Sequence, residues 1–403
     1  MNQQNSNRLF VACCLALTVT AMTFAIRAGI LTQLSANFEL SDAQLGWVNA
    51  MAFLGFPVAT VFGGLAYNWL GPKKLLIIAL IGHVLGLILT ISATGFGLLI
   101  ISSFCIGFAN GAVEAGCNPL VAKIFHTNKT TMLNRFHVWF PGGIVIGALI
   151  SFAMTQLALP WQSQIAVMLL PTILYGYLVL TQAFPVKSVE EISTFGNARN
   201  LLNPLFIFMA FCMSLTSVTE LGTQQWIERV LGASGVSPMI VMAMITGVMA
   251  VGRFFAGPFV HSFNPLGVLF ISAIFAALGL FLMSAAVGIE VYFSALLFAF
   301  GVTYFWPTML GFVAEKLPNT GALGMSVMGG VGMFSVSLWS PVIGRWIDLA
   351  RTEAQQYSLT AEHVELITGQ ATLEYLVLFP STLIIAFAFL LVQQKNKNQN
   401  SYA

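Results

Sequence analysis

The chain is a succession of apolar segments that are each long enough to cross a lipid bilayer. A spanning helix needs about 20 mostly apolar residues, and twelve segments of the sequence meet this requirement. Charged residues make up 7% of the 403 residues and hydrophobic residues 58%, whereas a soluble protein carries about 25% charged residues. A soluble fold of this size could not cover its surface with so few polar side chains. The sequence therefore predicts an all-α membrane protein.

The twelve predicted helices form two groups of six on either side of a more polar stretch. The first six are expected at 8–34, 43–67, 75–93, 96–124, 129–157 and 163–184. The second six are expected at 204–230, 237–260, 266–287, 290–316, 320–347 and 370–393. We therefore expect an N-terminal six-helix bundle over 1–184, a cytoplasmic linker over 185–203 and a C-terminal six-helix bundle over 204–403. The first apolar run is too long for a cleaved signal peptide and is expected to be retained.

Lysine and arginine residues gather on one side of this predicted topology. With the N-terminus placed inside, twelve of them fall on the inner side and three on the outer side. The inner set is Arg8, Lys73, Lys74, Lys123, Lys129, Arg135, Lys187, Arg199, Arg253, Lys316, Lys395 and Lys397. Cytoplasmic loops carry such an excess of positive residues, so both termini are expected in the cytoplasm. The short loops favour a bacterial inner membrane.

Two turns of the chain match each other without gaps at an offset of 193 residues. The matched pairs are Gly64 with Gly257, Pro72 with Pro265, and Leu85-Gly86-Leu87 with Leu278-Gly279-Leu280. A shared glycine and proline in the turn favour a duplicated half over chance similarity between apolar helices. Many transporters are built from such repeats, with the substrate site near the middle of the membrane.

The first of these turns resembles the loop signature of the major facilitator superfamily. The residues that carry the resemblance are Gly64, Asn68, Gly71, Pro72, Lys73 and Lys74. The family pattern has an acid where Asn68 stands and further basic residues where Trp69 and Pro72 stand. Gly252 and Arg253, with Gly257, are similar to the same loop in the second half. The resemblance implies two pseudo-symmetric six-helix bundles and secondary transport by alternating access.

Ionisable side chains within the predicted spans are few, and such groups are costly and usually functional. They are Arg27, His83, Glu114, His137 and Glu220. On the fourth helix, Asn110, Glu114 and Asn118 recur every four residues and share one face. Gly107 and Gly111 on that helix would let a neighbouring helix approach closely. Burial favours the neutral form of a carboxyl group, so Glu114 could carry a proton.

Arg27 on the first helix and His137 on the fifth are the other residues predicted to take part in proton coupling. A buried arginine must find an anion, which here could be Glu114 or a carboxylate of the substrate. His137 shares a face with Asn134 and is either a relay or a satisfied neutral histidine. His83 has no polar neighbour on its own helix, so we expect it to be a structural histidine.

The predicted substrate-binding residues lie mainly on the helices that line the central cavity in the superfamily: the first, fourth, seventh and tenth. The set is Asn110, Asn118, Asn134, Glu220, Gln224, Gln225, Trp226, Tyr304 and Trp306. Amides and carboxylates bind hydroxyl groups, and the two tryptophans could stack on a sugar ring. Pro307 follows Trp306 and predicts a kink in the tenth helix.

Three transport functions are consistent with these residues. Glu114-x-x-x-Asn118-Pro119 resembles the fourth-helix motif of the fucose/glucose/galactose:proton symporter branch, which implies proton-coupled uptake of a sugar. That branch carries an acid in its first helix, where this chain has Arg27. An arginine there is similar to organic-anion:proton symporters, so an organic anion or acidic sugar is the alternative substrate. A drug exporter is the third hypothesis, which the cluster of asparagines and glutamines disfavours.

Enzyme classes find little support in the sequence. It shows no nucleotide-binding loop, metal-ligand cluster or nucleophile–base spacing, so no cofactor is expected, and no basic block points to nucleic acid. The five cysteines lie inside apolar runs and are expected to be small packing residues. The expected partners are a small-molecule substrate, a proton and membrane lipid, with the protein acting as a monomer.

Overall fold

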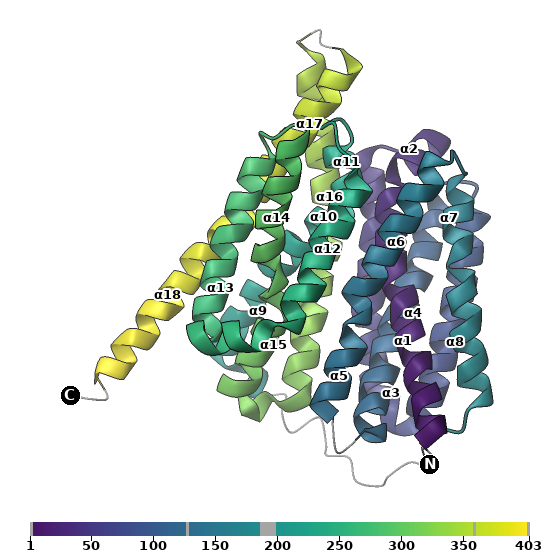
Figure 1. Ribbon diagram of the computed structural model, residues 1–403, viewed down its shortest axis with the longest axis vertical. Helices are drawn as coiled ribbons and strands as arrows, with labels where there is room; N and C mark the ends of the chain where they lie inside the picture. The colour runs from purple at the N-terminus through teal and green to yellow at the C-terminus, as the bar shows by residue number, and fades with distance from the viewer. Residues whose placement is uncertain (1–2, 126–128, 186–198, 358–359, 401–403) are drawn as a thin grey trace. The chain divides into compact units, whose positions relative to one another are not determined.

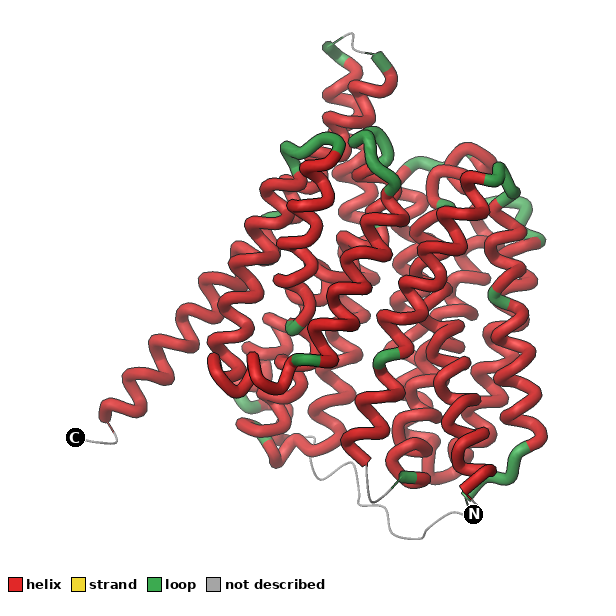
Figure 2. Tube along the Cα trace, in the orientation of Figure 1, coloured by secondary structure: helices red, strands yellow, loops and turns green. Residues whose placement is uncertain are grey.

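The protein is built from helices throughout the part that the structure describes (Figure 2). This computed structural model describes residues 3–125, 129–185, 199–357 and 360–400, and no strand occurs within these ranges. Eleven of the described helical segments are long and apolar enough to span a membrane, and Pro238–Phe254 is a shorter apolar helix. These twelve helices confirm the predicted all-α membrane fold.

The chain order of the helices follows the two predicted groups (Figure 1). The first group consists of α1 (Gln3–Gly29), α2 (Leu31–Phe38), α3 (Asp42–Ile91), α4 (Phe96–Ile124), α5 (Lys129–His137), α6 (Trp139–Gln156), α7 (Trp161–Val167) and α8 (Leu169–Thr181). The second consists of α9 (Pro204–Ser217), the π-helix η2 (Val218–Gly222), α10 (Thr223–Gln225), α11 (Ile227–Leu231), α12 (Pro238–Phe254), α13 (Ala256–Met283), α14 (Ile289–Thr303), α15 (Phe305–Lys316), the 3₁₀-helix η3 (Pro318–Thr320), α16 (Gly321–Gln355), α17 (Ala361–Leu376) and α18 (Leu378–Asn400).

The chain divides into two compact units. Unit 1 contains Met1–Ser193 and Ser337–Asp348, and unit 2 contains Thr194–Val336 and Leu349–Ala403. The boundary between residues 193 and 194 falls in the predicted linker, most of which, with Lys187, lies outside the described residues. The segment Ser337–Asp348 of α16 belongs to unit 1, although its sequence position is in the second half.

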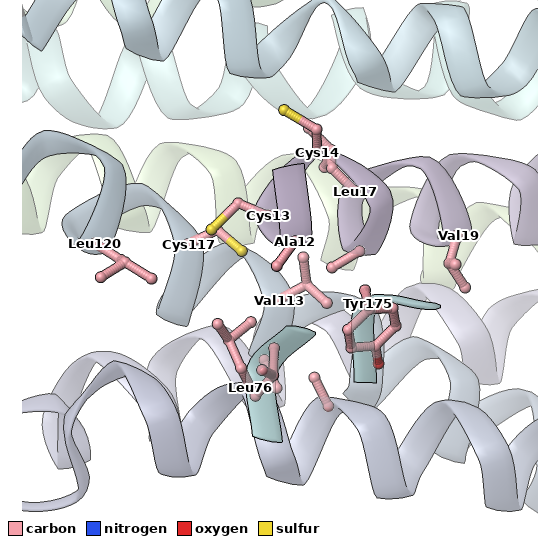
Figure 3. Packing of buried hydrophobic residues seen from close by; sticks show 14 of the residues in the cluster. Ala12, Cys13, Cys14, Leu17, Val19, Leu76, Val113, Cys117, Leu120 and Tyr175 are labelled. Carbon is pink, nitrogen blue, oxygen red and sulfur yellow. The ribbon is translucent and has the colours of Figure 1, made fainter. Parts of the chain in front are cut away.

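Small side chains fill the core of unit 1 where α1 meets α4. Cys13 of α1 and Cys117 of α4 lie next to each other and are completely buried, with Leu17, Val113 and Tyr175 around them (Figure 3). All five cysteines carry free thiols. Helix pairs inside a membrane gain stability mainly from close packing, and these compact side chains bring the two helix backbones together.

Two glycines on α4 bring that helix into direct contact with α3. A Cβ atom at Gly107 would overlap the carbonyl oxygen of Ala52, and one at Gly111 would overlap that of Phe56. Both glycines are four residues apart, so they lie on one face of α4. The prediction that they allow a neighbouring helix to approach is confirmed.

The sequence repeat is also present in the backbone. Helices α3 and α13 are each two helical segments joined at a single residue, which is Gly71 in α3 and Asn264 in α13. These residues are 193 positions apart, both have positive φ (71° and 53°), and a proline follows each. Glycine enters positive φ without steric cost, and asparagine has positive φ more often than most other residues. The Asn264 side chain also accepts a hydrogen bond from the backbone N–H of Gly267 at 3.0 Å, which caps the segment that follows.

The last two spans are longer than the apolar pattern predicts. Helix α16 continues to Gln355 rather than 347, and helical structure resumes at Ala361 rather than 370. Arg351 binds Glu365 with two hydrogen bonds of 2.7 and 3.1 Å, and the Thr360 hydroxyl caps α17 at the N–H of His363. Hydrophobic counting stops where the residues become polar, whereas capping and ion pairing extend the helices further.

Candidate functional site

A chain of buried hydrogen bonds crosses the interior of unit 1. The Tyr175 hydroxyl lies 2.9 Å from His83 Nδ1, and His83 Nε2 lies 2.8 Å from Asn110 Oδ1. Asn110 Nδ2 donates to the Thr23 hydroxyl oxygen at 3.0 Å, and the Thr23 hydroxyl donates to the Thr20 carbonyl at 2.6 Å. The chain therefore joins α8, α3, α4 and α1, with every side chain in it buried.

The direction of these bonds fixes the state of His83. Because Asn110 uses its amide nitrogen on Thr23, its carbonyl oxygen faces His83 and can only accept. Nε2 of His83 must then carry a proton, and Nδ1 accepts from the Tyr175 hydroxyl in the neutral imidazole. His83 is thus the structural histidine that the sequence predicts, but its polar partners come from other helices.

Arg27 lines a small cavity inside unit 1. The cavity measures about 20 Å³, which is room for about one water molecule or one carboxylate oxygen. It is lined by Thr23, Arg27, Ile30, Leu34, Val48, Thr90, Leu99, Ser103, Ile106, Ile165 and Met168. Arg27 is 6% exposed, and its guanidinium carbon lies 5.5 and 5.8 Å from the ring centres of Phe24 and Phe53. The cavity thus combines one cation with three hydroxyl side chains.

Glu114 lies at a different depth from Arg27. The hydrogen bond between Thr23 and Asn110 sets α1 and α4 side by side. Because successive spans alternate in direction, the first and fourth spans run in opposite directions. Arg27 is four residues beyond Thr23 and Glu114 four residues beyond Asn110, which separates their backbones by about 12 Å along the bundle at 1.5 Å per residue. Glu114 is half-buried and accepts a hydrogen bond of 2.6 Å from Asn118 Nδ2. The structure therefore does not support Glu114 as the anion for Arg27.

Of the two predicted site residues of the fifth span, His137 is not part of this cluster. His137 ends α5, and its side chain is exposed. Asn134 is in the same helix, but its side chain lies outside the described residues. The proposed pairing of these two residues stays a prediction.

The seventh span contains a π-helix at Glu220. Val218–Gly222 forms five residues of π-helix between α9 and α10, and single π turns occur frequently at functional sites. Glu220 is 4% exposed, and its Oε1 lies 3.1 Å from a guanidinium nitrogen of Arg253 in α12. Arg253, one of the twelve charges that the sequence assigns to the inner side, lies in the last turn of α12.

The residues after the π-helix are all buried in unit 2. Gln224 Nε2 contacts the Met249 sulfur at 3.5 Å, and Gln225 is 2% exposed. Trp226 is completely buried, and its indole Nε1 has no hydrogen-bond partner among the described residues. The buried Thr223 hydroxyl likewise has no hydrogen-bond partner among the described residues. Buried polar groups are normally paired, so these two atoms mark a place where a polar molecule could bind.

Tyr304 and Trp306 lie at the break in the tenth span, just before Pro307. The helix is interrupted between α14 and α15 at Tyr304, three residues before Pro307, and the kink is confirmed. The Tyr304 hydroxyl donates to the Gly252 carbonyl at 3.2 Å. The half-buried Trp306 ring packs over Gly332, where a Cβ would lie 3.0 Å from it.

Sequence reasoning missed Tyr175 as a partner of His83, and Arg253 as a partner of Glu220. Each pair joins residues that are far apart in the chain, 92 positions in the first case and 33 in the second. A sequence signal was nevertheless present, since a histidine and a glutamate inside apolar helices each need a polar partner.

Replacing His83 with leucine is expected to destabilise the protein strongly. The change leaves the Tyr175 hydroxyl and the Asn110 carbonyl buried without partners, at about 1–3 kcal/mol each. Thermal unfolding in detergent should show a clear fall in Tm. His363→Leu, at an exposed position of α17, is the matched control and should leave the Tm unchanged. An unchanged Tm in the His83 variant would show that the network contributes no stability.

Comparison with known proteins places these features in a family. The family model described as Major Facilitator Superfamily matches residues 12–344. The cis,cis-muconate transport protein of Acinetobacter baylyi is 24% identical over 62% of this chain and 64% of its own length. The arabinose-proton symporter of Escherichia coli is 26% identical over 42% of this chain and 36% of its own length. The matched parts thus cover less than two thirds of both relatives.

Solved structures show the same fold at low sequence identity. A bacterial homologue of the human lysosomal transporter Spinster, inward-facing and occupied, superposes with a TM-score of 0.78 over 98% of both chains at 14% identity. A D-xylose-proton symporter superposes with a TM-score of 0.74 over 93% of this chain and 96% of its own, also at 14% identity. These neighbours are transporters, and the interpretation of the chain as a transporter rather than an enzyme agrees with them.

Proposed function

Since this chain belongs to the major facilitator superfamily, we propose that it is a proton-coupled symporter whose substrate is a small organic anion. The observation that carries the proposal is the buried guanidinium of Arg27 at the cavity in unit 1. Guanidinium binds carboxylates through two parallel hydrogen bonds, and the Ser103 hydroxyl at the same cavity can donate to those oxygens, whereas the hydroxyls of Thr23 and Thr90 already donate to backbone carbonyls.

The cost of burying Arg27 supports a role in binding. A cation within a membrane span is expensive and is usually retained for function. Contacts with the Phe24 and Phe53 rings offset part of this cost. A carboxylate is the ligand whose charge and shape match this cation. The similarity to a muconate transporter points to the same chemical class.

A neutral sugar is the second candidate substrate. It is favoured by the buried amides of Gln224 and Gln225, by the unpartnered indole N–H of Trp226, and by the similarity to an arabinose-proton symporter. Export of apolar drugs has no comparable observation in its favour. The finer resemblance to the fucose/glucose/galactose branch stays a prediction, since the relatives above are named for muconate and arabinose.

The expected setting of this transporter is a bacterial inner membrane with both termini in the cytoplasm. Twelve inner charges against three outer ones support that orientation. A reporter fused after Ala403 tests it, because a reporter that is active only in the cytoplasm should be active there. The protein is expected to work as a monomer.

Uptake into proteoliposomes tests the substrate class directly. With an imposed pH gradient, we expect labelled cis,cis-muconate to accumulate and labelled arabinose to stay at the level of empty liposomes. Collapsing the gradient with a protonophore should abolish accumulation. Accumulation of arabinose alone would favour the sugar, and export or gradient-independent equilibration would contradict proton-coupled symport.

A further inference from the structure

We propose that the transported proton is carried by Glu220, with Arg253 as the counter-charge that replaces the proton when it leaves. This assignment rests on the proposed proton-coupled symport and names the group that performs the coupling. It differs from the sequence-based expectation, which gave proton coupling to Glu114, His137 and Arg27. The observation behind it is the ion pair between η2 and α12 in unit 2.

Arg253 is held in place independently of Glu220. Pro307 has no N–H, so the carbonyl of Thr303, four residues earlier, loses its helical hydrogen bond. Arg253 Nε donates a hydrogen bond of 2.9 Å to that carbonyl, and a different nitrogen of the same guanidinium donates one of 3.1 Å to Glu220. One side of the guanidinium is therefore anchored to the break in the tenth span. The bond to Glu220 can open while Arg253 stays where it is.

The pair is isolated from other charges in the described part of unit 2. No acidic or basic residue occurs in α9, in the segment Gly321–Val336 of α16 or in the segment Leu378–Gln394 of α18. On α15, Glu315 lies 12 residues beyond Thr303, about 18 Å along the helix. Glu228 and Arg229 of α11 lie two turns beyond Glu220. The Tyr304 hydroxyl donates to the Gly252 carbonyl next to Arg253, and the side chain of His261 lies outside the described residues.

This isolation makes the pair a two-state proton site. When Glu220 is ionised, Arg253 neutralises it. When a proton from water binds the carboxylate, Glu220 becomes a neutral acid that needs no counter-ion, and the cation of Arg253 loses one contact. The Arg253 side chain is 22% exposed and that of Glu220 5%, so the arginine is the more open end of the pair. Release of the proton restores the ion pair.

The π-helix contains Glu220, so binding or release of the proton takes place within the irregular part of the seventh span. Its geometry departs from the α-helices before and after it, and Gln224, Gln225 and Trp226 follow directly. Protonation at Glu220 therefore occurs one turn from the buried polar groups that we consider candidates for substrate binding. Glu114, by comparison, is half-buried and bonded to the neutral Asn118, and the ion pairs found among the described residues do not include it.

Glu220→Gln separates proton coupling from substrate movement, because glutamine resembles the protonated acid but releases no proton. In proteoliposomes with labelled cis,cis-muconate, this variant should lose accumulation driven by a pH gradient and keep exchange of labelled for unlabelled substrate. Glu290→Gln, an exposed glutamate at the start of α14, is the matched control and should keep both. The assignment is overturned if Glu220→Gln keeps accumulation, if it loses exchange as well, or if Glu114→Gln shows this split instead.

A measurement without substrate keeps this assignment distinct from the proposed function. Infrared difference spectra between low and high pH should show a protonated carboxyl band in the natural protein. The band should disappear in Glu220→Gln and persist in Glu114→Gln. Failure of the natural protein to move muconate or arabinose would sink the proposed symport alone. A band that survives in Glu220→Gln would sink the assignment of the proton to Glu220.

Discussion

Arg27→Gln is expected to remove nearly all uptake of a carboxylate substrate, with the main loss in KM. Removing one partner of a buried, hydrogen-bonded charge pair costs about 2–5 kcal/mol of binding free energy. That corresponds to a rise in KM of about 30-fold or more, at tenfold per 1.4 kcal/mol. Initial rates of muconate uptake against concentration measure it. Arg27→Lys keeps the charge without the forked geometry and should be intermediate.

Arg8→Gln is the control for this prediction, since Arg8 is exposed near the start of α1 and its loss should leave KM unchanged. The Tm of the Arg27 variant should also be compared with that of the natural protein. A folded Arg27→Gln protein with an unaltered KM for muconate would contradict a binding role for this arginine. It would favour the sugar as substrate, because a neutral molecule has no need of a cation.

Gly107→Val is expected to prevent α3 and α4 from packing. Even a Cβ at this position would overlap the Ala52 carbonyl, so a branched side chain must push the two backbones apart. Inserting atoms into a well-packed core costs about 1–3 kcal/mol and sometimes more, and a backbone clash lies at the upper end. The yield of monodisperse protein on size exclusion and its Tm should both fall sharply.

Gly97→Ala on the same helix separates this clash from the general effect of changing a glycine. A Cβ at Gly97 meets nothing within 4 Å, and alanine is favoured over glycine in helices by about 1 kcal/mol. That variant should have an equal or higher Tm. A Gly107→Val protein of normal yield and Tm would show that the α3–α4 contact tolerates separation.

The spans could be predicted from the sequence because each is determined by its own residues. A run of about 20 apolar side chains has one stable conformation in a bilayer, the helix, wherever the rest of the chain lies. The matched turns at Gly71 and Asn264 were visible as a repeat for the same reason. The polar ends of α16 and α17 were not visible, because the contact of Arg351 with Glu365 depends on how two helices meet.

The candidate site was predictable residue by residue but not pair by pair. Arg27, Asn110 and Glu220 were singled out because a polar group among apolar ones needs a reason to be there, and all three are buried. Their partners come from other helices, and no periodicity within a helix indicates them. Arg253 shows the difficulty, since a basic residue near the end of a span has the same sequence pattern in a loop as in an ion pair.

The burial of Arg27 has an electrical consequence for a transporter of anions. A membrane potential acts on net charge within the bilayer, with about 2.3 kcal/mol for one charge moved through 100 mV. The network around His83 is neutral. The ion pair of Glu220 with Arg253 sums to zero in the empty protein and gains one positive charge when Glu220 takes up the transported proton. A monocarboxylate bound at Arg27 brings one negative charge, which offsets that proton. Symport of one proton with one monocarboxylate therefore leaves the net charge of the moving sites unchanged, and accumulation should follow the pH gradient rather than the membrane potential.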